Sequence, residues 1–143
     1  MEVLWYNFTK HGCKQDLKHI IKRGEKMEER EEHLALLKKT DKKAVFEFCN
    51  LLRMKLGSNL QMIKLFGSKA RGDDDPESDI DILILVERRD ILVEDQILDI
   101  AYDTSLKHNV VIMPVVLSDS EFYSSLSKVG IFYSNVQKEG VVL

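Results

Sequence analysis

The sequence has little glycine, little proline and no long hydrophobic run. Its 143 residues include seven glycines and two prolines, while 44% are hydrophobic and 31% are charged. This composition excludes collagen-like and low-complexity chains and is typical of a globular protein with a buried core. The longest uncharged apolar runs, residues 82–86 and 110–117, are much shorter than the roughly 20 residues of a membrane-spanning helix. We therefore expect one compact domain and no transmembrane helix.

The sequence also has only two cysteines, and its N-terminus lacks a basic leader segment. Cys13 and Cys49 form no Cys-x-x-Cys motif, so we expect free thiols, with Cys49 in the core, and neither a disulfide framework nor a zinc site. The N-terminus has an acid at position 2 and no basic segment, so the prediction is a cytoplasmic protein. No histidine has a partner four residues on, which argues against metal or base roles for His11, His19, His33 and His108.

The chain has no excess of positive charge, because 24 acids against 21 bases give a net charge of −3. A global attraction for nucleic acid or for an anionic membrane is therefore not expected. Residues 10–43 are locally basic, but glutamates interrupt the lysines in the manner of a solvated helical face. Residues 73–81, in contrast, hold six acids and no base.

Two helices are predicted in the first part of the chain. Apolar residues at three-, four- and seven-residue steps predict an amphipathic helix over residues 15–38, whose charged middle suits association with a partner or a second copy. We assign residues 1–39 to a helical extension that serves association and residues 40–143 to the main domain. The second helix is expected to be capped by Thr40 or Asp41 and to end at Gly57.

Strands and helices alternate in the rest of the chain. Residues 60–66 and 79–86 have the length and composition of buried strands, and residues 110–117 predict an edge or bulged strand because Pro114 cannot donate a hydrogen bond. Residues 91–107 and 131–139 are expected to be helical. A short helix capped by Ser118 is predicted to reach Leu126, and residues 141–143 form a last apolar segment.

Two motifs at the first pair of strands carry the chemistry. Asp79 and Asp81 are expected at the start of a strand with both carboxylates on one face, where they repel each other unless a cation such as Mg²⁺ joins them. Gly67 and Ser68 end the preceding strand and would direct backbone N–H groups and a hydroxyl at an anion. Lys69 and Arg71 add positive charge, and Arg71 has the better shape for phosphate.

Each motif alone is compatible with an ordinary turn or a strand cap. Both motifs on adjacent strands predict a site for a metal-bound nucleoside triphosphate. Gly67 and Ser68 are followed by ten residues and then by Asp79-Ile80-Asp81, and the fuller patterns Gly-Ser-x-Ala-Arg-Gly and Ser-Asp-x-Asp are both present. In these patterns the chain resembles the minimal nucleotidyltransferases of the DNA polymerase β superfamily.

The resemblance implies an α+β fold with a mixed sheet, like the polymerase β palm, that binds ATP with Mg²⁺ and transfers AMP to a hydroxyl. It implies that Gly67 and Ser68 grip the phosphates with help from Arg71, and that Asp79 and Asp81 hold the metal. It also implies a HEPN-type helical partner in a toxin–antitoxin module, with the nucleotidyltransferase as antitoxin and a tyrosine of the partner as acceptor.

The chain departs from the family at one position. The family usually carries a third carboxylate on a later strand, whereas residues 108–117 contain no acid, and Val111 or a neighbour stands where one is expected. Asp103 and Asp119 lie nearby in sequence but are interpreted as surface or capping residues. Two alternatives therefore stay open: a degenerate module that neutralises its partner by binding alone, and transfer to a small hydroxylated molecule.

Overall fold

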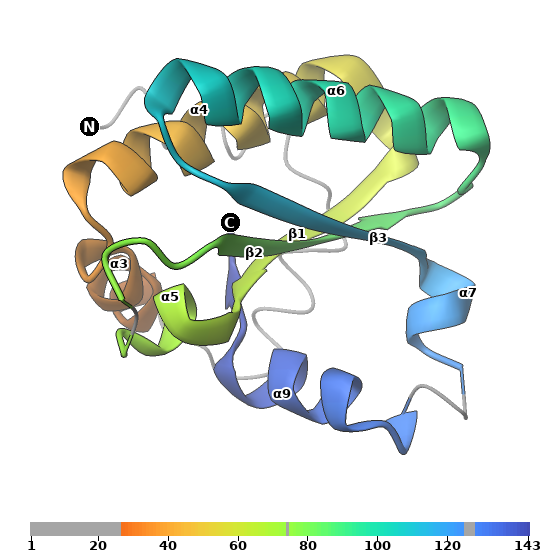
Figure 1. The fold of residues 1–143 in the computed structure, drawn as a ribbon. Helices are drawn as coiled ribbons and strands as arrows, with labels where there is room; N and C mark the ends of the chain where they lie inside the picture. The colour runs from red at the N-terminus through yellow and green to blue at the C-terminus, as the bar shows by residue number, and fades with distance from the viewer. Residues whose placement is uncertain (1–26, 74, 125–127) are drawn as a thin grey trace.

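The computed structural model describes residues 27–73, 75–124 and 128–143 and contains a four-stranded mixed sheet. Its strands lie in the order β3-β2-β1-β4 (Figure 1). Strand β1 runs antiparallel to both β2 and β4, and β2 runs parallel to β3. The bounds are Leu60–Phe66 for β1, Ile80–Val86 for β2, Ile112–Ser118 for β3 and Val141–Val142 for β4. The α+β fold with a mixed sheet is thus confirmed.

Helices cover both faces of the sheet (Figure 1). Helices α4 and α6 lie on one face, and α5, α7 and α9 lie on the other, with α3 beside α5. A short 3-10 turn links α4 to β1. The bounds are Met27–Ala35 for α3, Lys39–Leu56 for α4, Gly67–Arg71 for α5, Ile91–His108 for α6, Asp119–Phe122 for α7 and Ile131–Glu139 for α9.

Alternate residues of β2 enter two separate cores. Ile80, Ile82 and Ile84 pack with α4 and α6, including Phe48, whereas Leu83 and Leu85 pack with α7 and α9. Since side chains alternate across a strand, Asp81 lies on the α9 face of the sheet. The continuous apolar run that predicted a doubly buried strand therefore also fixes which way the acids point.

The strand predictions hold with small shifts. Strand β3 starts at Ile112 and not at residue 110, and it lies at the edge of the sheet, where Pro114 needs no ladder partner on its outer side. Strand β2 starts at Ile80, so Asp79 precedes it. Cys49 is buried in the core, as expected. None of the described helices is long and apolar enough to cross a membrane.

Three helix predictions need correction. The side chains of Thr40 and Asp41 do not cap α4, which has Lys38 at its N-cap and no side-chain cap; the Asp41 carboxylate lies inside the first turn and binds Lys69. Helix α3 ends at Ala35, short of residue 38, and the predicted residues 15–26 lie outside the described part. Helix α7 ends at Phe122, well before Leu126.

Candidate nucleotide-binding site

The first half of the site is the phosphate turn, by which we mean residues 67–72. Strand β1 ends at Phe66, and the chain turns directly into the short helix α5 at Gly67, whose φ is +76°. Gly72 ends α5 in the left-handed conformation with a φ of +77°, and its N–H donates to the carbonyl of Ser68 at 2.9 Å. Both backbone conformations favour glycine, so the spacing of the motif follows from the shape of the turn.

The second half of the site, Asp79 and Asp81, meets this turn at Gly67. Phe66 pairs with Asp81 across the antiparallel strands. A Cβ atom on Gly67 would lie 2.3 Å from Oδ2 of Asp81, so either the turn or the carboxylate would have to move. Glycine at this position therefore lets the Asp81 carboxylate approach the start of the phosphate turn, and the two motifs predicted from sequence lie in direct contact.

The carboxylates of Asp79 and Asp81 repel each other when no cation is bound between them. Asp79 is exposed just before β2, and Asp81 is half-buried within it. Burial raises the pKa of the Asp81 carboxyl, and the charge of Asp79 raises it further, while Arg71 partly opposes both effects. A divalent cation would relieve this repulsion, and carboxylate oxygens are the ligands that Mg²⁺ prefers.

Arg71 lies at the end of α5 and is held by two carboxylates. Its Nε donates to both oxygens of Asp73 at 3.1 and 3.2 Å, and its Nη1 donates to Glu139 at 3.0 Å. Hydrogen bonds to Glu139 and Asp73 raise the pKa of the guanidinium, so it stays charged. Sequence reasoning did not find Glu139, because it lies 68 residues away at the end of α9.

Lys69 does not contribute positive charge to the phosphate side, contrary to our expectation. Its side chain is buried, and its Nζ lies 2.8 Å from Oδ2 of Asp41. This ion pair joins α5, which forms most of the phosphate turn, to the first helical turn of α4. The physical reason is the helical geometry of α5, which places neighbouring residues on different sides, so Lys69 points inward.

The strand register shows which residues lie beside Asp79 and Asp81, where the family usually carries a third acid. Asp81 pairs with Met113 and Ile80 with Ile112, and the N–H of Ile80 donates to Val111 at 2.7 Å. Val111 and Met113 therefore share the face of Asp79 and Asp81, and both are about half exposed, at 50% and 47%. In the part of the chain that the structure describes, no group of three or more His, Cys, Asp or Glu is placed to hold a metal.

Neither sequence alternative for this acid reaches the site. Asp119 starts α7 at the far end of β3, six residues beyond Met113, which corresponds to about 20 Å of extended strand. Asp103 lies on α6, which covers the opposite face of the sheet. Asp103 is exposed, as interpreted from the sequence, whereas Asp119 is partly buried and follows Ser118, which caps α7.

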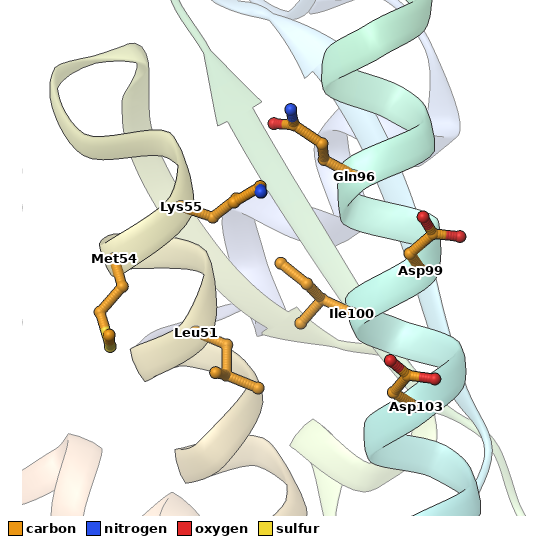
Figure 2. Close-up of a pocket in the computed structure, with 7 residues that line it drawn as sticks. All are labelled: Leu51, Met54, Lys55, Gln96, Asp99, Ile100 and Asp103. Atoms are coloured by element: carbon orange, nitrogen blue, oxygen red, sulfur yellow. The ribbon is translucent and has the colours of Figure 1, made fainter.

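A groove of about 390 Å³ lies between α4 and α6 (Figure 2). Its lining mixes apolar and charged side chains: Leu51, Met54, Lys55, Gln96, Asp99, Ile100 and Asp103. Because α4 and α6 cover the other face of the sheet from Asp81, the groove is separate from the candidate nucleotide site.

Comparison with known proteins places the chain in a family. Residues 47–143 match the family described as "Polymerase beta, Nucleotidyltransferase". The chain is 40% identical to MJ0604 of Methanocaldococcus jannaschii over 72% of its own length and 97% of the relative. It is 48% identical to MJ0141 of the same organism over 43% of its length and 63% of the relative. Both relatives carry the name "Putative protein adenylyltransferase".

A solved structure described as a toxin–antitoxin with AMP-PNP is similar at 23% identity and a TM-score of 0.48. That similarity covers 66% of this chain and 68% of the other. The family match spans the phosphate turn, both acids and β3, and the resemblance inferred from the motifs is confirmed. The chain belongs to the polymerase β nucleotidyltransferase family.

Proposed function

We propose that this protein transfers AMP from ATP to a hydroxyl group of a protein, and that the acceptor is a tyrosine of a HEPN-type helical partner. Family membership supports nucleotidyl transfer, and the names of the two relatives support a protein as acceptor. The observation that carries the proposal is the contact between Gly67 and the Asp81 carboxylate, because it joins a turn suited to phosphate with a carboxylate suited to Mg²⁺.

The residues present fit a magnesium ion. Asp79 and Asp81 supply hard oxygen ligands, and the repulsion that raises the pKa of Asp81 would be relieved by a cation. These two carboxylates would hold Mg²⁺, which when bound neutralises negative charge on the triphosphate and on the reacting phosphoryl group. Gly67 and Ser68 would bind the β- and γ-phosphates, and Arg71 would add a charge-assisted hydrogen bond.

In the reaction the acceptor oxygen forms a bond to the α-phosphorus, and the bond from that phosphorus to the bridging oxygen breaks. Pyrophosphate leaves with the bonding electrons, and the acceptor hydroxyl gives its proton to water or to the departing pyrophosphate. The positions beside the acids are occupied by Val111 and Met113, which cannot accept that proton. A positioned general base contributes about 10² to 10⁴-fold, so we expect slow transfer.

A second candidate function follows from Val111 and Met113, the apolar side chains beside the two acids. Without an acid at these positions, the protein would bind the nucleotide and its partner and neutralise the partner by contact alone. This candidate keeps the nucleotide site but needs no turnover. It differs from the first in one measurable property, the covalent label on the partner.

The test uses this purified chain with Mg²⁺, ATP and a HEPN-type helical protein, which is sought in the neighbouring reading frames. We expect ATP labelled at the α-phosphate to label the partner, ATP labelled at the γ-phosphate to leave it unlabelled, and Ser68→Ala to lower the yield. Label from the γ-phosphate would indicate a kinase. No label from either nucleotide, with tight partner binding retained, would support the binding module.

A further inference from the structure

Residues 33–41, which we call the brace, contact the phosphate turn and the loop after it. They comprise the last turn of α3, the link to α4 and the first turn of α4. The family match begins at residue 47, so the brace lies outside it. Each contact of the brace described below therefore joins a residue before the family match to a residue within it.

The first contact is the buried ion pair between Asp41 and Lys69. The two side chains are only 6% and 1% exposed, and their charged atoms lie 2.8 Å apart. A buried pair of this kind fixes geometry strongly, because removal of one partner leaves an uncompensated charge in the core. Since Lys69 follows Ser68 directly, the pair holds the inner side of the phosphate turn.

His33 and Leu36 make two further contacts with the phosphate turn. The ring Nδ1 of His33 lies 3.1 Å from the carbonyl oxygen of Ala70, and because a carbonyl only accepts, Nδ1 carries the hydrogen. The side chain of Leu36 lies so close to Gly72 that a Cβ there would be 2.9 Å from it. Both contacts fall at the C-terminal end of α5, at Ala70 within the helix and at Gly72 directly after it.

A fourth contact continues onto the loop that leads to the acids. Nζ of Lys38 donates to the carbonyl of Pro76 at 3.2 Å. The brace therefore spans the connection between the phosphate turn and β2. Helix α9 reaches α5 separately, through Glu139 and Arg71.

We propose that the brace is a positioning element for the nucleotide, with His33, Leu36 and Asp41 as positioning residues. The inference rests on the proposed function, because it assumes that the turn binds the phosphates of ATP. A turn with glycine at both ends has much conformational freedom to lose on binding, and contacts that fix it beforehand reduce that cost. This role is additional to the association expected for residues 1–39.

The expected kinetic signature is a change in KM for ATP. The turn would hold the β- and γ-phosphates, which leave as pyrophosphate. Weaker gripping therefore raises KM for ATP, and it lowers kcat only to the extent that the grip tightens as charge develops on the leaving group. A loss of the fold would instead lower the amount of active protein and with it the apparent kcat. The two effects can therefore be separated in one set of measurements.

The test compares variants of the full-length protein by calorimetric titration with ATP and Mg²⁺ and by steady-state kinetics. His33→Ala is expected to weaken ATP binding about fivefold, the equivalent of one lost hydrogen bond, and to raise KM by the same factor. His33→Asn keeps a donor near the position of Nδ1 and should restore most of the affinity. Leu36→Ala, which removes the contact with Gly72, should weaken binding two- to fivefold.

Glu47→Gln is the matched control. Glu47 lies on α4 and binds Lys107 and His108 of α6 on the other face of the sheet, so its loss disturbs the fold without touching the turn. ATP affinity should be unchanged in this variant. Wild-type affinity in both His33→Ala and Leu36→Ala, with the wild type binding ATP normally, would overturn the brace alone. A wild-type protein that does not bind ATP would overturn the proposed function as well.

Discussion

The two halves of the candidate site are organised to different degrees. The phosphate turn is contacted by the brace on one side and by Glu139 of α9 on another. The carboxylates of Asp79 and Asp81, in contrast, make no hydrogen bond or ion pair within the described residues, and the neighbouring Val111 and Met113 are half exposed. The protein thus shapes the half that would meet phosphate, whereas repulsion between the acids leaves the other half to be completed by a cation.

The largest effect is expected from Gly67→Ala, because this glycine joins the two halves. An alanine there would place Cβ 2.3 Å from the Asp81 carboxylate and would adopt a φ of +76°. The turn and the carboxylate cannot keep their present positions together. We expect ATP binding in the presence of Mg²⁺ to be lost, as measured by calorimetric titration, and the melting temperature to fall.

Gly57→Ala separates the cost of backbone conformation from that of the clash. Gly57 has a φ of +51°, but a Cβ there meets no atom within 4 Å. This variant should lose about 1 to 3 kcal/mol of stability from the strained backbone conformation alone and should bind ATP normally. Normal ATP binding by Gly67→Ala would show that the nucleotide does not use the contact between the halves.

The next effect concerns the acids. The double variant Asp79→Asn and Asp81→Asn should abolish the rise in melting temperature that ATP with Mg²⁺ gives the wild type, because the metal ligands are removed. Without ligands the same variant should melt at or above the wild-type temperature at neutral pH, since a repulsive pair is gone. An equal rise with ATP in the variant would place the nucleotide elsewhere.

The pH dependence of stability tests the same repulsion in the free protein. Burial and Asp79 raise the pKa of Asp81 above its usual 3.8, so the folded state binds the proton more tightly than the unfolded state. The stabilising contribution of the protonated carboxyl is complete below pH 3.8 and is lost as the pH rises through the raised pKa. Asp81→Asn should remove this part of the profile in denaturant titrations, and Mg²⁺ should flatten the profile of the wild type.

The sequence predicted the half of the site that consists of local motifs. The spacing of Gly67, Ser68 and the two acids, together with strand length and buried faces, was sufficient for the family and for the order of elements. It did not predict the partners of Lys69 and Arg71. These partners, Asp41 and Glu139, lie 28 and 68 residues away, and such pairings depend on how α4 and α9 pack. The cap of α4 was misplaced for the same reason, because the Asp41 carboxylate binds Lys69 and does not cap the helix.

The less organised half can be completed by substitution. Val111→Asp would place a carboxylate on the face of Asp79 and Asp81, one strand away and already half exposed, so the fold should tolerate it. We expect transfer of AMP to rise at least about tenfold, within the range that a general base supplies. Val110→Asp is the control, since its side chain packs against the α4 and α6 core and should only lower stability. An unchanged rate in Val111→Asp, with tighter metal binding, would show that metal affinity and not proton removal was lacking.

The smallest effect is expected from Glu139→Gln, which loosens the better-organised half. Glu139 and Asp73 occupy the Arg71 guanidinium, and a phosphate group must compete with them for its hydrogen bonds. The Arg71 side chain is about 40% exposed, and exposed ion pairs of this kind contribute little to stability because water screens them. Loss of the Glu139 charge should therefore tighten ATP binding about two- to fivefold at low salt, and the gain should shrink as ionic strength rises.

Glu87→Gln is the matched control. Glu87 is exposed just past the far end of β2, so its substitution should leave the affinity for ATP unchanged. Weaker ATP binding in Glu139→Gln would reverse the interpretation, because it would mean that α9 holds Arg71 in place for the phosphate, and the phosphate turn would then be positioned from both sides.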